Sequence, residues 1–347
     1  MKIGFVVNAV ETEGPTYTTV LLARVAESMG HEAWFIGVAD FIYDPSGSIC
    51  ARAVRARKSD HETIEAYLED VQGPENEKQR IIVDQLDVLM LRNDPAEDAV
   101  ERPWAQTSGI LFGQLAAARG VLVVNDPMHL ADAINKTYFQ HFPEEVRPRT
   151  CISRDPGEIR SFIESEKGHA VIKPLQGSGG QGVFIVKPDL DNLNPMIEAV
   201  TRDGYAIVQE YLPEAVDGDI RLFVLNGRPL RNGDAIAALR RVAADGDARS
   251  NLSAGGSIVK AEIDERAMRL VELVRPKLVR DGMYLVGLDV VGDKLMEINV
   301  FSPGGLHGAE ETLGVTFMDV IVRDLERKVR LARHYGAKLP NEVLATL

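Results

Sequence analysis

Lys173-Pro174-Leu175-Gln176-Gly177-Ser178-Gly179-Gly180-Gln181-Gly182-Val183-Phe184-Ile185-Val186 is the stretch that decides the fold. Short apolar runs at 170–173 and 183–186 predict a strand on each side of the glycines. Successive glycine N–H groups can point into one concavity, which suits phosphate oxygens, and Lys173 can add a point charge. A P-loop or a dinucleotide fingerprint opens a helix, whereas this loop is followed by a strand. The pattern therefore predicts a flap over a nucleotide; a hairpin without a ligand is the alternative.

A second stretch, Gly287-Leu288-Asp289-Val290-Val291-Gly292-Asp293-Lys294-Leu295-Met296-Glu297-Ile298-Asn299, reads as two strands joined by a tight turn. Glu297 and Asn299 are two residues apart, so they share one face of their strand. A three-residue loop at 292–294 would pair Asp289 with Glu297, whereas a two-residue loop would place Asp289 opposite Met296. The apolar pattern favours the three-residue loop, which brings all three polar side chains to one face.

These side chains offer two carboxylates and one amide. Oxygen ligands of this kind suit Mg²⁺. Like charges placed opposite each other destabilise a bare sheet, so a cation is expected between them. We predict a metal site at Asp289, Glu297 and Asn299; a polar edge that faces solvent is the alternative.

The first part of the chain alternates strands with helices. Strands are predicted at 2–8, 32–38, 86–91 and 121–124, and helices at 16–29 and 104–119. This alternation predicts a parallel sheet covered by helices, in a first α/β domain at residues 1–125. The polar stretch 43–80 is predicted to be irregular.

Beyond residue 125 the pattern changes. Helices are predicted at 130–142 and 265–280, and short strands at 206–210, 221–225, 236–240, 284–291 and 295–300. Short strands joined by hairpins predict an antiparallel α+β unit. The expected second domain spans 126–330, with a glycine-loop part at 126–205 and a metal and acceptor part at 206–330. Residues 331–347 are expected to be a C-terminal tail.

Composition excludes several classes of protein. The 347 residues carry a formal net charge of −13, and binding to nucleic acid depends on neutralising phosphates. No apolar run is long enough to cross a bilayer, and the chain starts with a strand pattern rather than a signal peptide. Cys50 and Cys151 lack metal-ligand spacing, which fits a reducing compartment. A cytoplasmic protein that binds neither membranes nor nucleic acid is expected.

With these elements in place, the chain resembles the bacterial glutathione synthetase family of ATP-grasp enzymes, from its first strand to about residue 325. The motifs that carry the resemblance are Arg92-Asn93-Asp94-Pro95, Asn135-Lys136, the Lys173 loop, Gln209-Glu210-Tyr211-Leu212-Pro213, Asp217-Gly218-Asp219-Ile220-Arg221, Arg241 with 249–256, Gly287-Leu288-Asp289 and Glu297-Ile298-Asn299-Val300-Phe301-Ser302-Pro303. The resemblance implies an ATP-grasp fold with an N-terminal parallel α/β domain. It also implies an ATP-dependent ligase that joins a carboxylate to an amine through an acyl phosphate.

The resemblance gives each motif a role. ATP would be held by Lys136, Lys173, Gly177, Ser178, Gly179, Gly180, Gln209, Glu210, Tyr211 and Leu212. Two Mg²⁺ ions, with Mn²⁺ as the alternative metal, would be held by Asp289, Glu297 and Asn299. Catalytic contacts to the transferred phosphate would come from Arg221, Arg241 and Arg249. Substrates would be bound by Arg92, Asp94, Asn251, Ser302, Gly304 and Gly305.

Structural readings compete with several of these roles. Lys136 could be a surface lysine on a helix, and Arg241 could solvate the end of a strand. Arg221 could pair with Asp219. The segment 243–256 is either a lid that keeps water from the acyl phosphate or a loop without a function.

The segment after Ser302 and Pro303 departs from the resemblance. The family usually carries threonine, a small residue, isoleucine and arginine there, but this chain has Gly304-Gly305-Leu306-His307-Gly308-Ala309-Glu310-Glu311. That pattern is closer to ligases that attach amino acids to carboxyl groups of other acceptors. His307 could touch the acceptor, act as a base, or serve only the structure.

Three functions are therefore open from the sequence. The first is a glutathione synthetase, which joins γ-glutamylcysteine to glycine with ATP. The second is a related peptide-forming ligase with a different amine acceptor. The third is a non-catalytic nucleotide-binding regulatory protein, which the retained metal ligands disfavour. The expected partners are small molecules, namely an acidic peptide or amino acid and an amine acceptor, and the resemblance implies a homo-oligomer.

Overall fold

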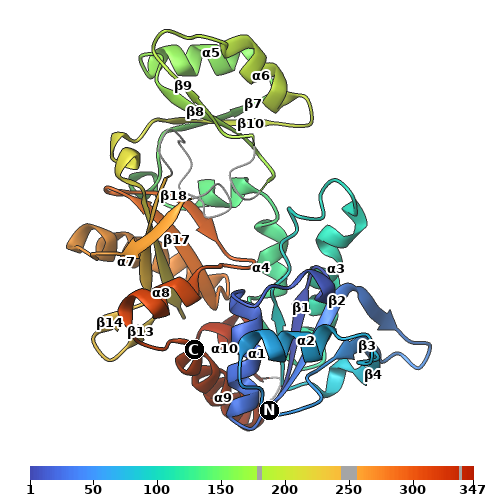
Figure 1. Cartoon of the computed structure of the whole chain (residues 1–347). Coiled ribbons are helices and arrows are strands. Elements are labelled where there is room, and N and C mark those ends of the chain that lie inside the picture. The colour runs from blue at the N-terminus through green and yellow to red at the C-terminus, as the bar shows by residue number, and fades with distance from the viewer. Residues whose placement is uncertain (178–181, 244–255, 336–337) are drawn as a thin grey trace.

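The structure, a computed structural model, describes residues 1–177, 182–243, 256–335 and 338–347. Its strands form three main sheets, which we call the N-terminal, central and glycine-loop sheets. Figure 1 shows the N-terminal sheet at the bottom right, the central sheet at the middle left and the glycine-loop sheet at the top. The predicted fold class, a parallel α/β unit followed by an antiparallel α+β unit, is confirmed.

The N-terminal sheet has the order β4-β3-β2-β1-β5-β6. Its strands are β1 (Lys2–Val7), β2 (Glu32–Tyr43), β3 (Ile49–Val54), β4 (Gln79–Ile82), β5 (Val88–Leu91) and β6 (Leu122–Val124). Helices α1 (Thr18–Ser28) and α2 (Ile64–Gln72) cover one face, and α3 (Ser108–Ala118) covers the other. β1 runs parallel to β2 and β5, and β5 runs parallel to β6. Helix α1 connects β1 to β2, and helix α3 connects β5 to β6, because parallel neighbours need a crossover connection.

Residues 43–80 are ordered into regular elements, so the prediction that they are irregular was wrong. β2 continues into this stretch and turns into β3, and α2 and β4 follow. Thr63 caps α2 by accepting a hydrogen bond from the Ala66 N–H at 3.2 Å. Tyr67 and Val71 lie on the buried face of α2. Because only one face of α2 is buried, its other face carries polar residues, and the polar composition of 43–80 did not indicate a helix.

The glycine-loop sheet is antiparallel and has the order β7-β10-β8-β9. Its strands are β7 (Thr150–Ser153), β8 (Ala170–Pro174), β9 (Phe184–Val186) and β10 (Ala206–Glu210). Helices α5 (Pro156–Ser165) and α6 (Leu193–Thr201) lie over its outer face (Figure 1). They bury Ile159, Ile163 and Ile197 against Ile172 and Val208. β8 and β9 pair with each other, as the prediction of a strand on each side of the glycines requires.

The central sheet has the order β16-β15-β11-β17-β18, with β12 beside β11. Its strands are β11 (Asp219–Leu225), β12 (Arg228–Pro229), β15 (Ala238–Val242), β16 (Ser257–Lys260), β17 (Leu285–Val291) and β18 (Lys294–Asn299); β13 (Arg231–Asn232) and β14 (Ala235–Ile236) form a separate pair. Helix α7 (Glu265–Arg280) packs on one face through Val271 and Val274, and α8 (Leu306–Leu313) packs on the other through Leu306. α7 continues as one helix through Pro276.

The hairpin of β17 and β18 turns differently from the prediction. Its loop has two residues instead of three, so that Val291 pairs with Lys294. A β-bulge at Met296 then places Asp289 opposite Glu297. The predicted loop length was wrong, yet the predicted pairing is present, because the bulge adds the residue that the shorter loop removes.

Short helices carry the remaining connections. They are η1 (Val10–Thr12), η2 (Val83–Gln85), η3 (Pro103–Thr107), α4 (Pro127–Asp132), η4 (Lys136–His141), η5 (Glu144–Val146) and η6 (Pro213–Asp217). The helix predicted at 130–142 is thus two pieces, α4 and η4, and Asn135 caps the second by accepting the Thr137 N–H at 2.9 Å. In the part of the chain that the structure describes, no helix is long and apolar enough to cross a membrane.

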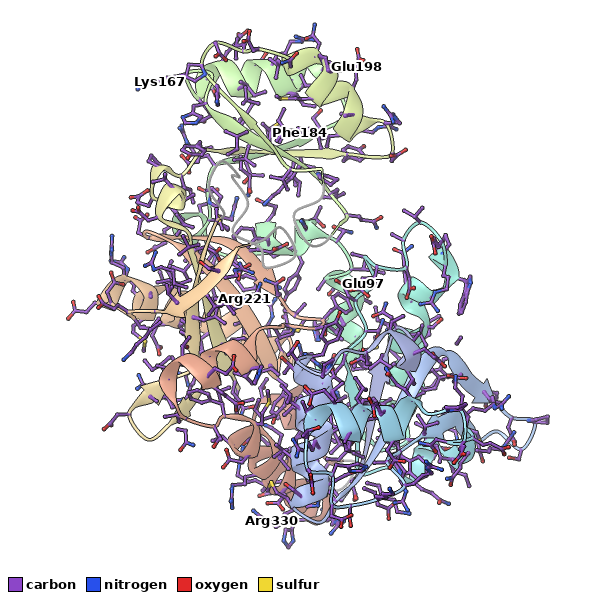
Figure 2. All side chains as sticks on the ribbon, in the orientation of Figure 1. Glu97, Lys167, Phe184, Glu198, Arg221 and Arg330 are labelled. Atoms are coloured by element: carbon purple, nitrogen blue, oxygen red, sulfur yellow. The ribbon has the colours of Figure 1, made fainter. Side chains whose placement is uncertain are left out.

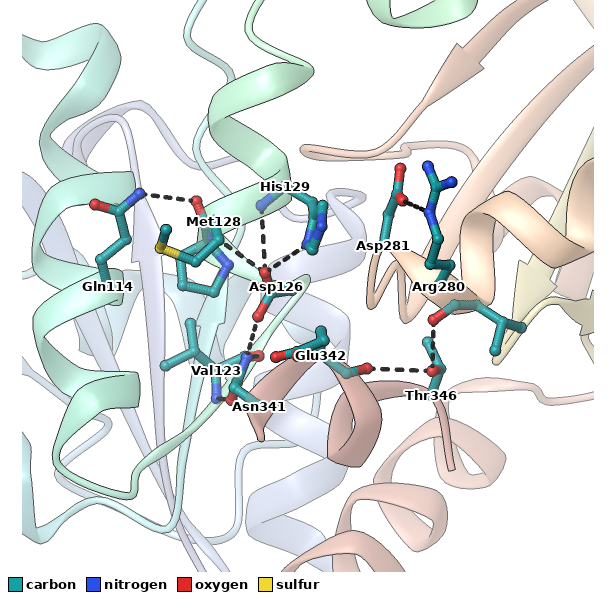
Figure 3. A network of polar contacts seen from close by, with 12 residues as sticks. Gln114, Val123, Asp126, Met128, His129, Arg280, Asp281, Asn341, Glu342 and Thr346 are labelled. Atoms are coloured by element: carbon teal, nitrogen blue, oxygen red, sulfur yellow. Dashed lines mark hydrogen bonds and ion pairs between the residues drawn. The ribbon is translucent and has the colours of Figure 1, made fainter. Parts of the chain in front are cut away.

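The C-terminal segment joins the N-terminal unit to the rest. Helix α9 (Met318–Tyr335) continues through residue 330 and packs along α1, and α10 (Asn341–Thr346) lies against β6. The side chain of Asn341 accepts the Val123 N–H at 2.9 Å and donates to the Val123 carbonyl and to Asp126, both at 2.8 Å (Figure 3). Residues 338–347 are therefore packed against the sheet rather than free in solvent.

Candidate active site

A cavity of about 970 Å³ lies between the three sheets. Figure 2 labels Arg221, on the central sheet, and Glu97, on a loop of the N-terminal unit, and both line the cavity. Every predicted site residue that the structure describes also lines it. These residues are Arg92, Asp94, Lys136, Lys173, Gly177, Gln209, Glu210, Tyr211, Leu212, Arg221, Arg241, Asp289, Glu297, Asn299, Ser302, Gly304 and Gly305. The predicted site residues Ser178, Gly179, Gly180, Arg249 and Asn251 lie outside the described residues.

Two arginines bind Asp289 within the central sheet. Arg221 stands opposite Asp289 in the β11–β17 register and donates to both of its oxygens, to Oδ2 at 3.0 Å. Arg241 contacts Asp289 Oδ2 at 2.9 Å and also pairs with Asp219. The competing reading that Arg221 pairs with Asp219 is therefore wrong: Asp219 pairs with Arg241, its neighbour across β11 and β15.

These pairs fix the charge state of the cluster. Burial works to raise the pKa of Asp289, but Arg221 and Arg241 outweigh burial and lower the pKa to about 2. Burial works to lower the pKa of Arg241, but Asp289 and Asp219 outweigh it and raise the pKa above its ordinary value. Asp289 and Arg241 are thus both ionised at neutral pH, and Arg241 is buried in ion pairs rather than solvating a strand end.

Glu297 and Asn299 lie beside Asp289 on the same face. The Asn299 amide donates to Asp289 Oδ2 at 3.3 Å. Lys136 Nζ lies 3.3 Å from Glu297 Oε1, and its side chain is only 23% exposed. Lys136 therefore points toward the predicted metal ligands and not away from the molecule.

The residues of this face fit a hard cation. Asp289 and Glu297 supply carboxylates and Asn299 supplies an amide oxygen, which are the ligands that Mg²⁺ prefers. Across the described ranges, no group of three or more His, Cys, Asp or Glu side chains is placed to hold a metal. Mg²⁺ is commonly held by one or two carboxylates together with substrate phosphates, so two carboxylates are sufficient when a nucleotide is present.

Lys173 lies near the end of β8, just before the glycine loop. Burial, together with the nearby charge of Lys136, lowers its pKa to about 8, while Glu297 and Asp289 oppose the shift. The Lys136 N–H donates to the Leu175 carbonyl at 3.3 Å, so the backbone at Lys136 is bonded to the segment that directly follows Lys173. Gly177 has φ of 138°, a conformation that side-chain-bearing residues rarely adopt. Two adjacent lysines beside a glycine turn suit an anion with several charges.

The predicted ATP-binding residues 209–212 comprise the last two residues of β10 and the two that follow it. The Gln209 amide donates to Thr150 Oγ1 at 3.1 Å, and the Glu210 carboxylate accepts from the Arg149 N–H at 2.8 Å. The Tyr211 ring stacks on His169 with ring centroids 3.9 Å apart. These side chains are held by protein partners, so this segment can offer its backbone groups to a ligand.

The predicted substrate residues join the N-terminal unit to the central sheet. Arg92 is 4% exposed and donates to the Pro303 carbonyl at 3.1 Å, and Arg221 donates to the next carbonyl, Gly304, at 3.0 Å. The Asp94 N–H donates to Asn8 at 2.8 Å. Gly305 has φ of 94° at the start of α8.

The sequence reasoning missed the acidic side of the cavity. Glu13 and Glu97 line it, and so does Thr18 at the start of α1. The connection from β1 to α1 leaves the carboxyl end of a parallel strand, where ligands of open α/β sheets bind. That topological rule was the signal available for Glu13.

The chain has a fold similar to that of several solved structures. It is similar to the crystal structure of D-cycloserine synthetase, with a TM-score of 0.60 and 15% identity over 95% of this chain and 99% of that one. It is also similar to D-alanine–D-alanine ligase from Bacillus anthracis, with a TM-score of 0.55 and 13% identity over 96% and 99% of the two chains. At these identities the likeness concerns the fold.

Sequence comparison gives the family. The N-terminal domain of prokaryotic glutathione synthetase matches residues 1–131, and its ATP-grasp domain matches residues 135–314. The glutathione synthetase of Synechocystis sp. is 32% identical over 94% of this chain and 100% of its own length. That of Gloeobacter violaceus is 34% identical over 93% and 95%. The chain belongs to the prokaryotic glutathione synthetase family and is an ATP-dependent ligase that forms C–N bonds.

Proposed function

We propose that the chain joins γ-glutamylcysteine to glycine with ATP and releases glutathione, ADP and phosphate. The observation that carries the proposal is the meeting of three groups in one cavity. The paired lysines 136 and 173 suit nucleotide phosphates, Asp289 and Glu297 suit a hard cation, and the buried Arg221 suits a transferred phosphoryl group. Family membership supports the reaction class and the substrates.

Lys136, Lys173 and the turn at Gly177 would hold the phosphates of ATP. Bound phosphates would raise the pKa of Lys173 back toward its ordinary value, because they add negative charge where Lys136 now repels it. The backbone of 209–212 would hold the adenine, since Glu210 is already bound to Arg149.

Asp289, Glu297 and Asn299 would hold the divalent cations, with Mg²⁺ in two positions and Mn²⁺ as the alternative. A bound cation neutralises charge on the phosphoryl oxygens. Lys136 now contacts Glu297, so a nucleotide that takes over this lysine would free the carboxylate for a cation.

The chemistry has two steps. An oxygen of the cysteine carboxylate attacks the γ-phosphorus, the bond to the bridging oxygen breaks, and ADP leaves with the electron pair. The glycine amine then attacks the acyl carbon, the C–O bond to phosphate breaks, and the amine loses a proton. Arg221 and Arg241 are held in place by Asp289 and Asp219, so their charges face the phosphoryl group without reorganisation.

One observation favours a second candidate, a ligase of this family with another amine acceptor. His307 and Glu311 line the cavity one turn apart on α8, with His307 Nε2 3.5 Å from Glu311 Oε1. A glycine carboxylate is best bound by a cation, whereas Glu311 brings a negative charge to this wall. An acceptor with an additional ammonium or hydroxyl group would fit it better.

Phosphate release in the presence of ATP and Mg²⁺ tests both candidates. The assay combines γ-glutamylcysteine with glycine or with a panel of other amines, and each substrate is also omitted in turn. Release that requires γ-glutamylcysteine and glycine together supports the proposal. Release that requires a different amine supports the second candidate, and release with none of the combinations contradicts both.

A further inference from the structure

The Glu13 carboxylate, at the N-terminal side of the cavity, has no hydrogen-bond or ion-pair partner in the part of the chain that the structure describes. It follows β1 in the connection to α1 and lines the cavity. Its Oε2 atom is shut off from water and has no hydrogen-bond partner among the described residues. No ion pair to its carboxylate occurs within the same ranges. A buried carboxylate is costly unless a cationic or donating group binds it, so a ligand group of that kind is expected here.

Arg92 is the opposite case, a buried cation whose hydrogen-bond acceptors among the described residues are neutral. Its Nε donates to Thr19 Oγ1 at 3.2 Å, and its Nη2 donates to the Pro303 carbonyl at 3.1 Å. Both acceptors are neutral, and among the described residues no carboxylate lies within ion-pair distance of it. The described residues engage two of the five N–H groups of the guanidinium, so donors remain for a carboxylate of a ligand.

The start of α1 adds further donors beside Arg92. Tyr17 precedes the helix and gives no side-chain cap. The first N–H groups of a helix lack partners within it and carry partial positive charge. Thr18 is 1% exposed, lines the cavity, and its Oγ1 has no hydrogen-bond partner in the described part of the chain. The contact of Arg92 with Thr19 shows that guanidinium and helix start are adjacent.

We propose that Glu13, Arg92 and Thr18 form a receptor for the zwitterionic amino-acid head of the acyl donor. Glu13 binds its α-ammonium, and Arg92 binds its α-carboxylate together with Thr18 and the first turn of α1. The inference rests on the proposed function, because the γ-linkage of γ-glutamylcysteine leaves both of these groups free.

The position of the receptor agrees with this assignment. Arg92 holds the Pro303 carbonyl and Arg221 holds the neighbouring Gly304 carbonyl. The receptor is therefore next to Arg221, the arginine that we propose binds the transferred phosphoryl group. A donor with its head at Glu13 and Arg92 can direct its other carboxylate toward Arg221.

Calorimetric binding to the full chain, with Mg²⁺ and a non-hydrolysable ATP analogue present, tests the receptor. The ligands are γ-glutamylcysteine and glutaryl-cysteine, which differ only in the α-ammonium group. The unmodified chain is expected to bind γ-glutamylcysteine roughly tenfold or more tightly than glutaryl-cysteine. Glu13→Gln is expected to lose this preference by weakening only the ammonium-bearing ligand.

Glu11→Gln is the matched control, because Glu11 is exposed two residues away. It should keep the preference, and unchanged affinity of Glu13→Gln for the ATP analogue shows that the variant is folded. A Glu13→Gln protein that keeps the preference, or an unmodified chain that shows none, overturns the receptor. An unmodified chain that shows the preference but forms no ADP with glycine supports the receptor and contradicts the proposed function.

Discussion

Asp289 is bound by two arginines in the cavity, Arg221 and Arg241, and Asn299 donates a hydrogen bond to it. We predict that Asp289→Asn and Glu297→Gln each lower the rate of ADP formation by roughly 1,000-fold or more, because each removes a charge at the developing transition state. Asp191→Asn, at an exposed position, should change nothing. Circular dichroism should show all three variants folded, and near-normal turnover in either site variant would remove the metal assignment.

Glu13 gives the substrate affinity a predicted pH dependence. Burial raises its pKa to about 7, Arg92 opposes the shift, and Glu97 adds to it. As the pH falls through 7, Glu13 takes up a proton and loses the charge that binds the ammonium. The KM for γ-glutamylcysteine should therefore rise below pH 7 and level off above it, measured from roughly pH 6 to 8.

The same pH series distinguishes titration of Glu13 from titration of the nearby Glu97. Glu13→Gln should show a high KM that no longer changes with pH, whereas Glu97→Gln should keep the rise. An unchanged pH profile in Glu13→Gln would contradict the assignment.

For single residues, the sequence could identify those whose spacing or motif marks them as part of a site. The spacing of Asp289, Glu297 and Asn299 places them on one strand pair, and the resemblance covered the arginines. Glu13 is a single glutamate in a loop, and nothing in its neighbours distinguishes it from a surface residue. The rule for parallel strands points to this connection, and the buried Oε2 atom, which has no hydrogen-bond partner among the described residues, singles out Glu13 within it.

Among the elements, the paired strands β11 and β15 position Arg221 and Arg241 so that both reach Asp289. Gly218 precedes β11 with φ of 87°, and a Cβ atom there would lie 2.0 Å from the Arg241 carbonyl oxygen. Gly218→Ala must push the two strands apart, so it should destabilise the fold by about 3 kcal/mol or more. Denaturant unfolding measures this, with Gly204→Ala as the control.

A Cβ atom at Gly204 would meet no atom within 4 Å. That substitution should change the free energy of unfolding by less than about 0.5 kcal/mol. Equal stability of the two variants would show that the close approach of β11 and β15 does not constrain position 218.

Element prediction failed where two local features compensate each other. The apolar pattern of the hairpin from Val290 to Met296 fits a three-residue loop, and it equally fits a two-residue loop with a bulge. Both put Asp289 opposite Glu297, so the pattern could not choose between them. The stretch 43–80 failed for another reason, because half-buried elements such as α2 look polar in a window of sequence.

Across the whole molecule, α10 holds the N-terminal sheet to the rest of the chain (Figure 3). Asn341→Ala would leave the N–H and carbonyl of Val123 and one contact of Asp126 unsatisfied in the interior. The expected loss is about 2 kcal/mol of unfolding free energy, measured by denaturant unfolding. Asn194→Ala, on the exposed face of α6, is the control and should be neutral; equal stability of the two variants would contradict this role of α10.

The arrangement of the three sheets around one cavity was implied by resemblance alone. Periodicity predicted most strands and both fold classes, but it carries no information on how sheets face one another. Residues 331–347 were expected only as a C-terminal tail, and nothing in their sequence shows that Leu344 and Ala345 are buried or that α10 contacts β6 and α7, which lie far away in the sequence.

Transfer of a carboxylate oxygen to phosphate tests the central claim most directly. γ-Glutamylcysteine labelled with ¹⁸O in its cysteine carboxylate is incubated with glycine, ATP and Mg²⁺, and the released phosphate is examined by mass spectrometry. If the carboxylate is activated as an acyl phosphate, one labelled oxygen appears in phosphate for each glutathione formed from fully labelled peptide. Glutathione formed together with unlabelled phosphate would contradict the account.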